Sequence, residues 1–373
     1  MKFLIITHVN HTLQAGKYYG YAPYIQEMNL WLKHVDEVTI LAPLTKREIS
    51  AIDTSYKHSK LTFKAVPSIQ FTSVGKTLVS LVKIPVILWA IYRASKETDH
   101  IHLRCPGNIG LLGCFVQILF SRKSKSAKYA GNWDPKSKQP WSYRLQKWIL
   151  KNEFLTKNIK TLVYGDWKQS SKNIQPFFTA SYSESEKESI ASKALAKKIN
   201  LLFVGTVSSN KRPMISVKVV QQLKDRGHNV ALSIFGEGKE KVIIEDYIKV
   251  HELEDCVTLH GNKDKAVVKE AYKKSHFLVF MSKSEGWPKV VAEAMFWKCL
   301  PISTNVSCVP QMLELGERGS IVEPEVEAII AEIEHYIFYE KHYQEKVDKA
   351  FEWSRNYTLD KFEKEIKHIL IED

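Results

Sequence analysis

Two glutamates, Glu285 and Glu293, are the residues whose placement most clearly suggests chemistry. They follow a buried-type strand, and between them Gly286-Trp-Pro288 opens an apolar helix. Proline suits a first helical turn, and the free N–H groups and dipole of such a helix start favour a phosphate. A carboxylate beside that phosphate is suited to sugar hydroxyl groups. The segment therefore predicts a site for a phosphorylated, hydroxyl-bearing ligand.

Glu293 lies within the apolar helix itself, in the run VVAEAMFW. A carboxylate buried there without partners is costly. Ribose hydroxyl groups would satisfy it, and so would an Arg or Lys of the protein. The sequence leaves both readings open.

The segment from Phe280 to Trp297 resembles the E-x7-E motif of the retaining, GT-B-fold glycosyltransferases of family four, the glycosyl transferases group 1. Members transfer a sugar from a UDP-, GDP- or ADP-sugar, with retention at the anomeric carbon and without a metal. The resemblance implies that Glu285 is catalytic and contacts the donor sugar, and that Glu293 holds the ribose. It also implies donor contacts from the intervening residues Gly286, Trp287, Pro288 and Lys289.

A second match is the loop after the strand that begins at Leu201, which is similar to the family's V-G-R-x4-K sequence. Gly205 would bind the donor, and Lys211 would be a second catalytic residue that neutralises the leaving diphosphate. Thr206 stands where the family has Arg, and Arg212 is the candidate replacement and a further donor contact. The remaining matches are Phe235–Gly238, Val257–Gly261, Leu300–Ser303 and the tail Trp353–Phe362.

The N-terminal half resembles the family only in outline. Gly16 is the candidate for the family's glycine loop near the diphosphate, and Asn132 and Asp134 stand in the region where many members carry a catalytic-site His. Arg104, at a strand end, is a candidate to hold acceptor or phosphate, and packing explains it equally well. These three polar residues are the predicted acceptor side.

Both halves of the chain alternate short β-rich apolar runs with helical stretches, which is typical of parallel sheets built from β-α-β units. We expect an α/β protein of two Rossmann-like, doubly wound domains that face a cleft, the GT-B architecture. Ligands in such sheets bind at the carboxyl ends of the strands. The predicted boundaries are residues 1–178 for the acceptor-side domain, 179–198 for a Ser- and Lys-rich linker, and 199–353 for the nucleotide-sugar domain, with 354–373 as a helix crossing back.

Composition favours a globular protein of the cytoplasm. Five scattered cysteines without a C-x-x-C pair argue against disulfides or zinc. The apolar stretches Thr77–Tyr92 and Ile109–Phe120 are expected to be core-facing helices, since the first is broken by Lys83 and Pro85 and the second is too short to span a bilayer.

The net charge of +13 predicts an anionic partner. The basic, Trp-bearing stretch Arg122–Lys147 suggests contact with an anionic membrane, at the inner face where lipid-linked acceptors for surface polysaccharide would lie, although a solvated face explains it as well. No recognition motif for nucleic acid accompanies the charge.

The predicted partners are therefore a nucleotide-sugar donor, UDP- or GDP-linked, and a glycan or lipid-linked acceptor. No cofactor is expected, and no metal, because the chain has no Asp-x-Asp pair. The main alternative is a nucleotide-sugar epimerase of similar fold. A basic nucleic-acid- or membrane-binding protein and an NAD-dependent enzyme are the others, the last because FGEGKEK is a fragment of G-x-G-x-x-G.

Overall fold

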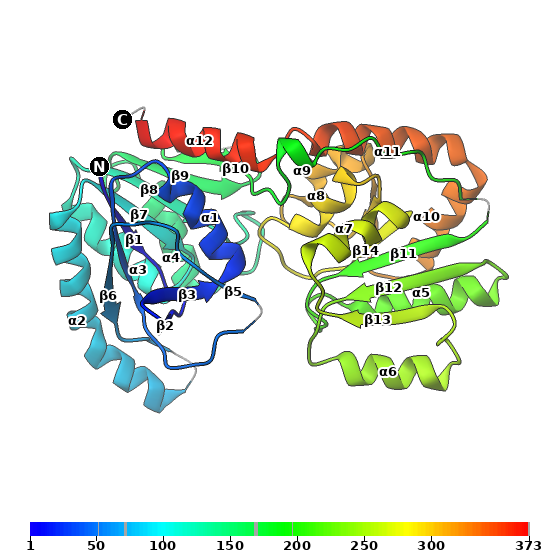
Figure 1. Ribbon diagram of the computed structural model, residues 1–373, viewed down its shortest axis with the longest axis horizontal. Helices are drawn as coiled ribbons and strands as arrows, with labels where there is room; N and C mark the ends of the chain where they lie inside the picture. Colours follow the sequence, from blue (N-terminus) through cyan, green and yellow to red (C-terminus); the bar gives the residue numbers. More distant parts are fainter. Residues whose placement is uncertain (51, 71–72, 168–170, 196, 372–373) are drawn as a thin grey trace. The chain divides into compact units, whose positions relative to one another are not determined.

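The computed structural model describes residues 1–373 except 51, 71–72, 168–170, 196 and 372–373. The chain forms two compact units (Figure 1). The first contains Met1–Phe178 and the C-terminal residues from Phe362 onward, and the second contains Thr179–Lys361. Each unit has its own parallel sheet and helices, so the expected pair of α/β domains is confirmed.

The first unit is built on a seven-stranded parallel sheet of order β10-β9-β8-β7-β1-β4-β6. Its strands are β1 (Lys2–Ile6), β4 (Glu37–Pro43), β6 (Leu61–Val66), β7 (His100–Cys105), β8 (Ser124–Tyr129), β9 (Ile159–Tyr164) and β10 (Ile174–Phe177). The central strand β1 is buried from Phe3 to Ile6, as expected of a parallel strand covered on both faces. The alternation of strands and helices expected of β-α-β units is confirmed in this unit.

Helices cover this sheet on both sides. They are α1 (Ala22–Leu32), α2 (Val74–Glu97), α3 (Asn108–Val116), α4 (Trp141–Lys151) and α12 (Leu359–Ile371). The connections through α2, α3 and α4 all step across the sheet in one direction, whereas the connection through α1 steps in the other. Because such crossovers are right-handed, α2, α3 and α4 form one layer and α1 lies on the opposite face.

The prediction that both long apolar stretches face the core is only partly right. In α3, Ile109, Leu112 and Cys114 are buried as expected. In α2, the stretch Thr77–Glu97 has a mean hydropathy of 1.5, yet only 22% of its apolar window is buried, and by length and composition it could cross a membrane. The prediction is therefore wrong for the outward side of α2.

The prediction of a basic, Trp-bearing surface at Arg122–Lys147 is also wrong in part. Lys125 and Lys128 lie inside β8 and are buried, as is Trp133, whose ring packs 4.8 Å from that of Tyr129. The Lys128 ammonium donates to the Phe178 carbonyl at 3.0 Å. Buried ammonium groups with protein partners are unavailable to a membrane.

A small antiparallel sheet that the sequence analysis missed combines two strands of the segment after β1 with one strand from the segment after β4. It consists of β2 (Thr12–Gln14), β3 (Lys17–Tyr21) and β5 (Asp53–Ser55). Ala15 and Gly16 form the two-residue connection between β2 and β3, and both have positive φ, 48° and 73°. This is the geometry of a tight hairpin turn, which favours glycine.

The second unit has a six-stranded parallel sheet of order β13-β12-β11-β14-β15-β16. The strands are β11 (Ile199–Val204), β12 (Val230–Phe235), β13 (Val257–Gly261), β14 (Phe277–Phe280), β15 (Leu300–Ser303) and β16 (Ser320–Ile321). The helices are α5 (Pro213–Asp225), α6 (Lys241–Val250), α7 (Lys265–Lys274), α8 (Lys289–Phe296), α9 (Val309–Met312), α10 (Val326–Phe338) and α11 (Glu340–Ser354). The helix predicted over residues 354–373 corresponds to α12, and α11 precedes it as a separate helix.

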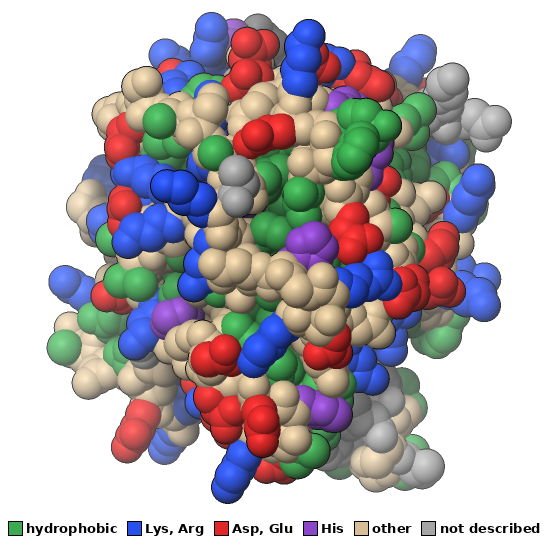
Figure 2. Space-filling view, turned by 90° about the vertical axis from the view of Figure 1, so that its right-hand side faces the viewer, with side chains coloured by type: hydrophobic (Ala, Val, Ile, Leu, Met, Phe, Trp, Pro, Cys, Tyr) green, Lys and Arg blue, Asp and Glu red, His purple; other side chains and the backbone are tan. Residues whose placement is uncertain are grey.

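Acidic and basic side chains are interspersed on the face of the molecule drawn in Figure 2. The net positive charge is therefore not spread evenly over the surface.

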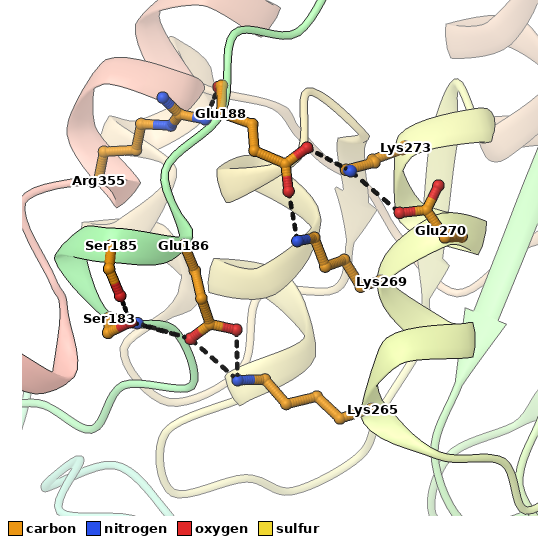
Figure 3. Close-up of polar contacts among 9 residues, drawn as sticks. All are labelled: Ser183, Ser185, Glu186, Glu188, Lys265, Lys269, Glu270, Lys273 and Arg355. Carbon is orange, nitrogen blue, oxygen red and sulfur yellow. Dashed lines mark hydrogen bonds and ion pairs between the residues drawn. The ribbon is translucent and has the colours of Figure 1, made fainter.

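The predicted linker 179–198 belongs to the second unit, and its residues 183–188 lie beside α7 (Figure 3). Glu186 pairs with Lys265, and Glu188 pairs with Lys269 and with Lys273, all on one side of α7. Further along, the Lys193 ammonium lies within hydrogen-bonding distance of four carbonyl oxygens, which share its three N–H groups. They belong to Tyr272, Ser275, Trp297 and Lys298. The segment therefore ties the ends of α7 and α8 together.

Candidate functional site

Glycines shape the carboxyl edge of the second sheet. Gly205, after β11, and Gly236, after β12, have φ of 147° and 134°, and a β-carbon on Gly236 would lie 1.9 Å from the Gly205 carbonyl oxygen. A β-carbon on Gly238 would lie 2.1 Å from the Val207 carbonyl oxygen, and Val207 N–H donates to the Glu237 carbonyl at 3.0 Å. The two loops thus pack backbone against backbone, a contact that only glycine permits.

Lys211 and Glu285 meet at this edge. Lys211 follows β11 and Glu285 follows β14, and the Lys211 ammonium donates to Glu285 Oε1 in an ion pair. Ser282 Oγ donates to the same oxygen at 2.5 Å, and the Phe280 ring lies 5.2 Å from the ammonium. The side chains are 22% and 12% exposed, so the pair is partly shielded but reachable from solvent.

Asn210 joins the two loops that carry this pair. Its carbonyl accepts a bond from Lys283 N–H at 2.8 Å, and its side-chain amide donates to the Ser284 carbonyl at 3.2 Å. Sequence reasoning missed both Asn210 and Ser282, because neither residue type distinguishes a loop clamp from a solvated position. The clamp fixes the position of Lys211 relative to Glu285.

Thr206 is exposed, and its carbonyl accepts a bond from Ser208 Oγ at 3.4 Å. Arg212 begins α5 in a left-handed conformation, and its guanidinium donates to the Met281 carbonyl at 3.4 Å. In this state Arg212 thus holds the end of β14.

The loop before α8 presents the expected helix start. Pro288 is the N-cap residue and Lys289 the first residue of α8, and no described side chain caps the helix. Gly286 is anchored through its carbonyl, which accepts a bond from Ser307 Oγ at 2.7 Å. Trp287 packs with its ring 5.9 Å from that of Tyr357. The first-turn N–H groups of α8 can therefore serve an anion.

Glu293, in the second turn of α8, is half-buried and receives two hydroxyl hydrogen bonds. Ser181 Oγ donates to Oε1, and the Tyr272 hydroxyl donates to Oε2 at 3.1 Å. Burial, with Glu293 beside it, raises the pKa of Tyr272, so the hydroxyl keeps its proton. The carboxylate is thus satisfied by hydroxyl donors, the same groups that a ribose would offer.

The first unit has a separate pocket at the carboxyl edge of its own sheet, lined by residues that include His8, Asn10, Asn108 and Tyr143. His8 follows β1 and packs on Gly107, where a β-carbon would lie 2.3 Å from His8 Nδ1. Burial and the charge of Arg104 lower the pKa of His8, which favours the neutral ring. Sequence reasoning missed His8, although a polar ring close behind the first strand could have indicated a residue at the carboxyl edge of the sheet.

The predicted acceptor-side residues make internal contacts instead of lining this pocket. Arg104 pairs with Glu27 of α1 at 2.8 Å, and its side chain is only 12% exposed. Asn132 Oδ1 accepts a bond from Asp134 N–H at 2.9 Å, and Asp134 Oδ1 accepts one from Lys136 N–H at 2.8 Å. Packing and loop turns account for these residues, as the hairpin turn accounts for Gly16.

In the part of the chain that is described, no group of three or more His, Cys, Asp or Glu side chains could hold a metal ion. All five cysteines are free and buried. Burial raises the pKa of the Cys299 and Cys308 thiols to about 12, so neither is a nucleophile at neutral pH.

Residues 184–353 match the family model of glycosyl transferases group 1. The matched range includes Lys211, Glu285 and Glu293. An uncharacterised glycosyltransferase of Haemophilus influenzae is 30% identical over 172 residues, which are 46% of this chain and 48% of that protein. The chain thus spans about half the length of this curated relative.

Solved structures show the same fold over the whole chain. A sucrose-phosphate synthase from Thermosynechococcus elongatus has a TM-score of 0.69 at 16% identity and covers 100% of this chain and 98% of its own. Anabaena HepE in complex with UDP has a TM-score of 0.71 at 12% identity, with 100% of both chains covered. The lipopolysaccharide outer core galactosyltransferase WaaB has a TM-score of 0.70 at 13% identity, with 100% of this chain and 99% of that chain covered. The expected GT-B fold is therefore confirmed.

Proposed function

We propose that this chain is a glycosyltransferase that moves a sugar from a nucleotide-diphosphate donor, UDP- or GDP-linked, to a glycan or lipid-linked acceptor. The observation that carries the proposal is the Lys211–Glu285 ion pair at the carboxyl edge of the second sheet, in a domain that matches a glycosyltransferase family. HepE, which shares the fold, binds UDP. The acceptor would enter the pocket that contains His8.

The charges of the site suit departure of a diphosphate. A donor diphosphate would draw the Lys211 ammonium from Glu285 to its oxygens, and the N–H groups at the start of α8 would add positive potential. Such preorganised charges stabilise a leaving group in the transition state. Glu285 would keep its bond from Ser282 and accept bonds from sugar hydroxyls, while ribose hydroxyls would take the place of the Ser181 and Tyr272 donors at Glu293.

We propose that transfer retains the anomeric configuration by a front-face substitution. The bond between the anomeric carbon and the diphosphate oxygen breaks, and the acceptor oxygen bonds to the same face. The acceptor proton passes to the departing diphosphate, so the step balances without a covalent enzyme intermediate. We further propose that no metal is needed, because Lys211 and α8 supply the positive charge.

The test is a transfer assay with UDP- and GDP-sugars and the variant Lys211→Gln. Removing the cation that faces the leaving group should lower kcat/KM about 10²- to 10³-fold. Lys218→Gln, on the exposed side of α5, is the matched control and should keep full activity. Equal activity of both variants would remove Lys211 from the mechanism, and nuclear magnetic resonance of the product would report the anomeric configuration.

Two further arms address the alternatives. A nucleotide-sugar epimerase would yield an altered sugar still joined to its nucleotide, whereas transfer yields free nucleoside diphosphate and a glycoside. Activity lost in excess EDTA and restored by manganese would contradict metal independence.

We also propose that the protein acts in the cytoplasm, in synthesis of a surface polysaccharide or glycoconjugate. Its free, buried cysteines suit a reducing compartment.

A further inference from the structure

The most unusual surface of the first unit is the outward side of α2, which runs along the outside of the unit (Figure 1). Leu78, Val82, Val86 and Trp89 recur at helical spacing and are all more than half exposed, with Val82 at 78%. Soluble surfaces rarely carry such an apolar stripe without a partner. We define these four residues as the α2 stripe.

The α2 stripe continues onto the residues that follow α3. The Trp89 ring packs 5.7 Å from that of Tyr92, and the Tyr92 ring packs 5.5 Å from that of Phe120. Leu119, beside Phe120, is 70% exposed. Trp and Tyr are the side chains enriched where a protein meets the headgroup region of a membrane.

Basic residues accompany the stripe. Between residues 73 and 152, fourteen residues are Lys or Arg, and the only acidic ones are Glu97, Asp99 and Asp134. Of these acids, Glu97 pairs with Lys64. Three exposed cations, Arg93, Lys96 and Arg122, follow the stripe at the C-terminal end of α2 and the end of the α3 segment.

The connectivity of α2 argues against a span across a bilayer. The helix joins β6 to β7 of one sheet, and its other side is buried in the core through Ile87, Ile91 and Ala94. A helix with one side on the protein core and one apolar side outward can lie in the membrane plane with cations toward the headgroups. The geometry therefore fits insertion from one leaflet.

We propose that the α2 stripe docks on an anionic lipid bilayer, with Arg93, Lys96 and Arg122 against the headgroups. Charge complementarity favours this occupant over a second copy of the chain, because an identical face offers the three exposed cations no net negative charge, whereas anionic headgroups do. This surface differs from the one expected over Arg122–Lys147, in which Lys125 and Lys128 are buried. The proposal does not depend on sugar transfer.

The test is flotation of the full chain with vesicles of phosphatidylglycerol and phosphatidylcholine, and with pure phosphatidylcholine, in the absence of donor and acceptor. Wild type should bind the anionic vesicles. The triple variant Val82→Gln/Val86→Gln/Trp89→Gln should bind at least about tenfold more weakly, since each apolar side chain contributes when buried. The matched control is Val242→Gln/Ile243→Gln/Val250→Gln, three equally exposed residues of α6, which should bind like wild type.

A second pair of variants tests the cations. Arg93→Gln/Lys96→Gln/Arg122→Gln should reduce binding to anionic vesicles about ten- to a hundredfold, whereas Lys198→Gln/Lys249→Gln/Lys341→Gln, exposed in the second unit, should leave it unchanged. If the apolar triple variant does not fold, quenching of tryptophan fluorescence by brominated lipid provides the readout. The quenching should fall in Trp89→Phe, which keeps an aromatic ring but removes the indole fluorophore.

Three results would overturn the proposal. They are no binding of wild type to anionic vesicles, equal loss in the α2 and α6 variants, and a wild-type dimer in analytical ultracentrifugation that the α2 triple variant dissociates. The last would assign the stripe to a second copy. None of these results bears on sugar transfer, so the two proposals fail separately.

Discussion

Gly236 and Gly205 approach each other at the edge of the second sheet more closely than any side chain allows. The φ of Gly236 is 134°, and the carbonyl oxygen of Gly205 occupies the place of its missing β-carbon. Gly236 is therefore required both by its positive φ and by the lack of room for a β-carbon. The geometry explains physically why the run FGEG follows β12.

We expect Gly236→Ala to destabilise the second unit by about 3 kcal/mol or more, because positive φ and a backbone clash both oppose the methyl group. UDP binding should be lost with it. Gly227→Ala is the matched control, since Gly227 also has positive φ, 85°, but open space around it, and should cost only about 1 kcal/mol. Urea unfolding measures the loss of stability in both variants. Equal losses would show that the loop shifts to accommodate the methyl group at residue 236.

At the residue scale, the sequence identified Lys211 and Glu285 as candidate donor-site residues but not their mutual contact. Lys211 and Glu285 were separate contacts to the donor in the prediction, and the structure pairs them. The partners Ser282, Asn210 and Ser181 could not be predicted, because a serine or asparagine in a loop has no pattern that reveals its orientation. Arg104 was a candidate for binding acceptor or phosphate, but it pairs with Glu27. That pairing could not be predicted, because the two residues lie 77 positions apart in sequence.

Elements were predicted best where burial on both faces gives an unbroken apolar run, as in β1 and β14. β8 is harder to predict, because Lys125 and Lys128 belong to a stretch whose basic composition suggests an exposed surface. Their ammonium groups reach carbonyl oxygens of Phe120 and Phe178 from inside the unit. The outward side of α2 could not be predicted, because apolar composition alone does not distinguish a core-facing side from a partner-facing one.

Lys193 provides a prediction about the segment 179–198. Its ammonium is shared by four carbonyl oxygens around the ends of α7 and α8, and no uncharged side chain could bond to them in the same way. A positive charge there also suits the helix dipoles. Lys193→Met should lower the free energy of unfolding by about 2–4 kcal/mol through unsatisfied buried carbonyls. Lys198→Met, exposed nearby, should change it by less than about 0.5 kcal/mol.

His276 makes the stability of the second unit depend on pH. Its Nδ1 accepts a bond from Asn200 N–H at 3.0 Å, so the proton is on Nε2, which donates to the Ala194 carbonyl at 3.1 Å. Burial, together with the charge of Lys193, lowers the pKa of His276 to about 4 from 6.5. The folded state thus disfavours the proton that the unfolded state accepts.

Since the folded pKa is depressed, this contribution to stability is fully present above pH 6.5 and is lost as pH falls toward 4. The loss amounts to roughly 3 kcal/mol. Urea unfolding of wild type and His276→Gln at pH 7.0, 5.5 and 4.5 checks this. The stability difference between the two proteins should shrink with falling pH, and a constant difference would show that His276 does not titrate in this range.

At the scale of the whole molecule, the chain passes from the first unit to the second after Phe178 and returns after Lys361. The return is made by α12, whose residue Phe362 is buried beside Phe177 and Phe178, with ring centroids 5.3 and 5.8 Å away. Glu363 pairs with Lys33 at 2.6 Å. The last helix in sequence is thus part of the first unit's core.

This connectivity predicts which unit a change in the tail affects. Phe362→Ala should lower the stability of the first unit by about 3–5 kcal/mol, because a large buried ring leaves a cavity. In calorimetry, UDP should raise the melting temperature of the second unit's transition, since a ligand stabilises only the fold that binds it. Phe362→Ala should leave the melting temperature of that transition unchanged. Phe338→Ala, at a residue 79% exposed, is the control and should move neither transition. If Phe362→Ala instead lowers both transitions together, the two units unfold cooperatively, and the tail stabilises the whole molecule rather than one half.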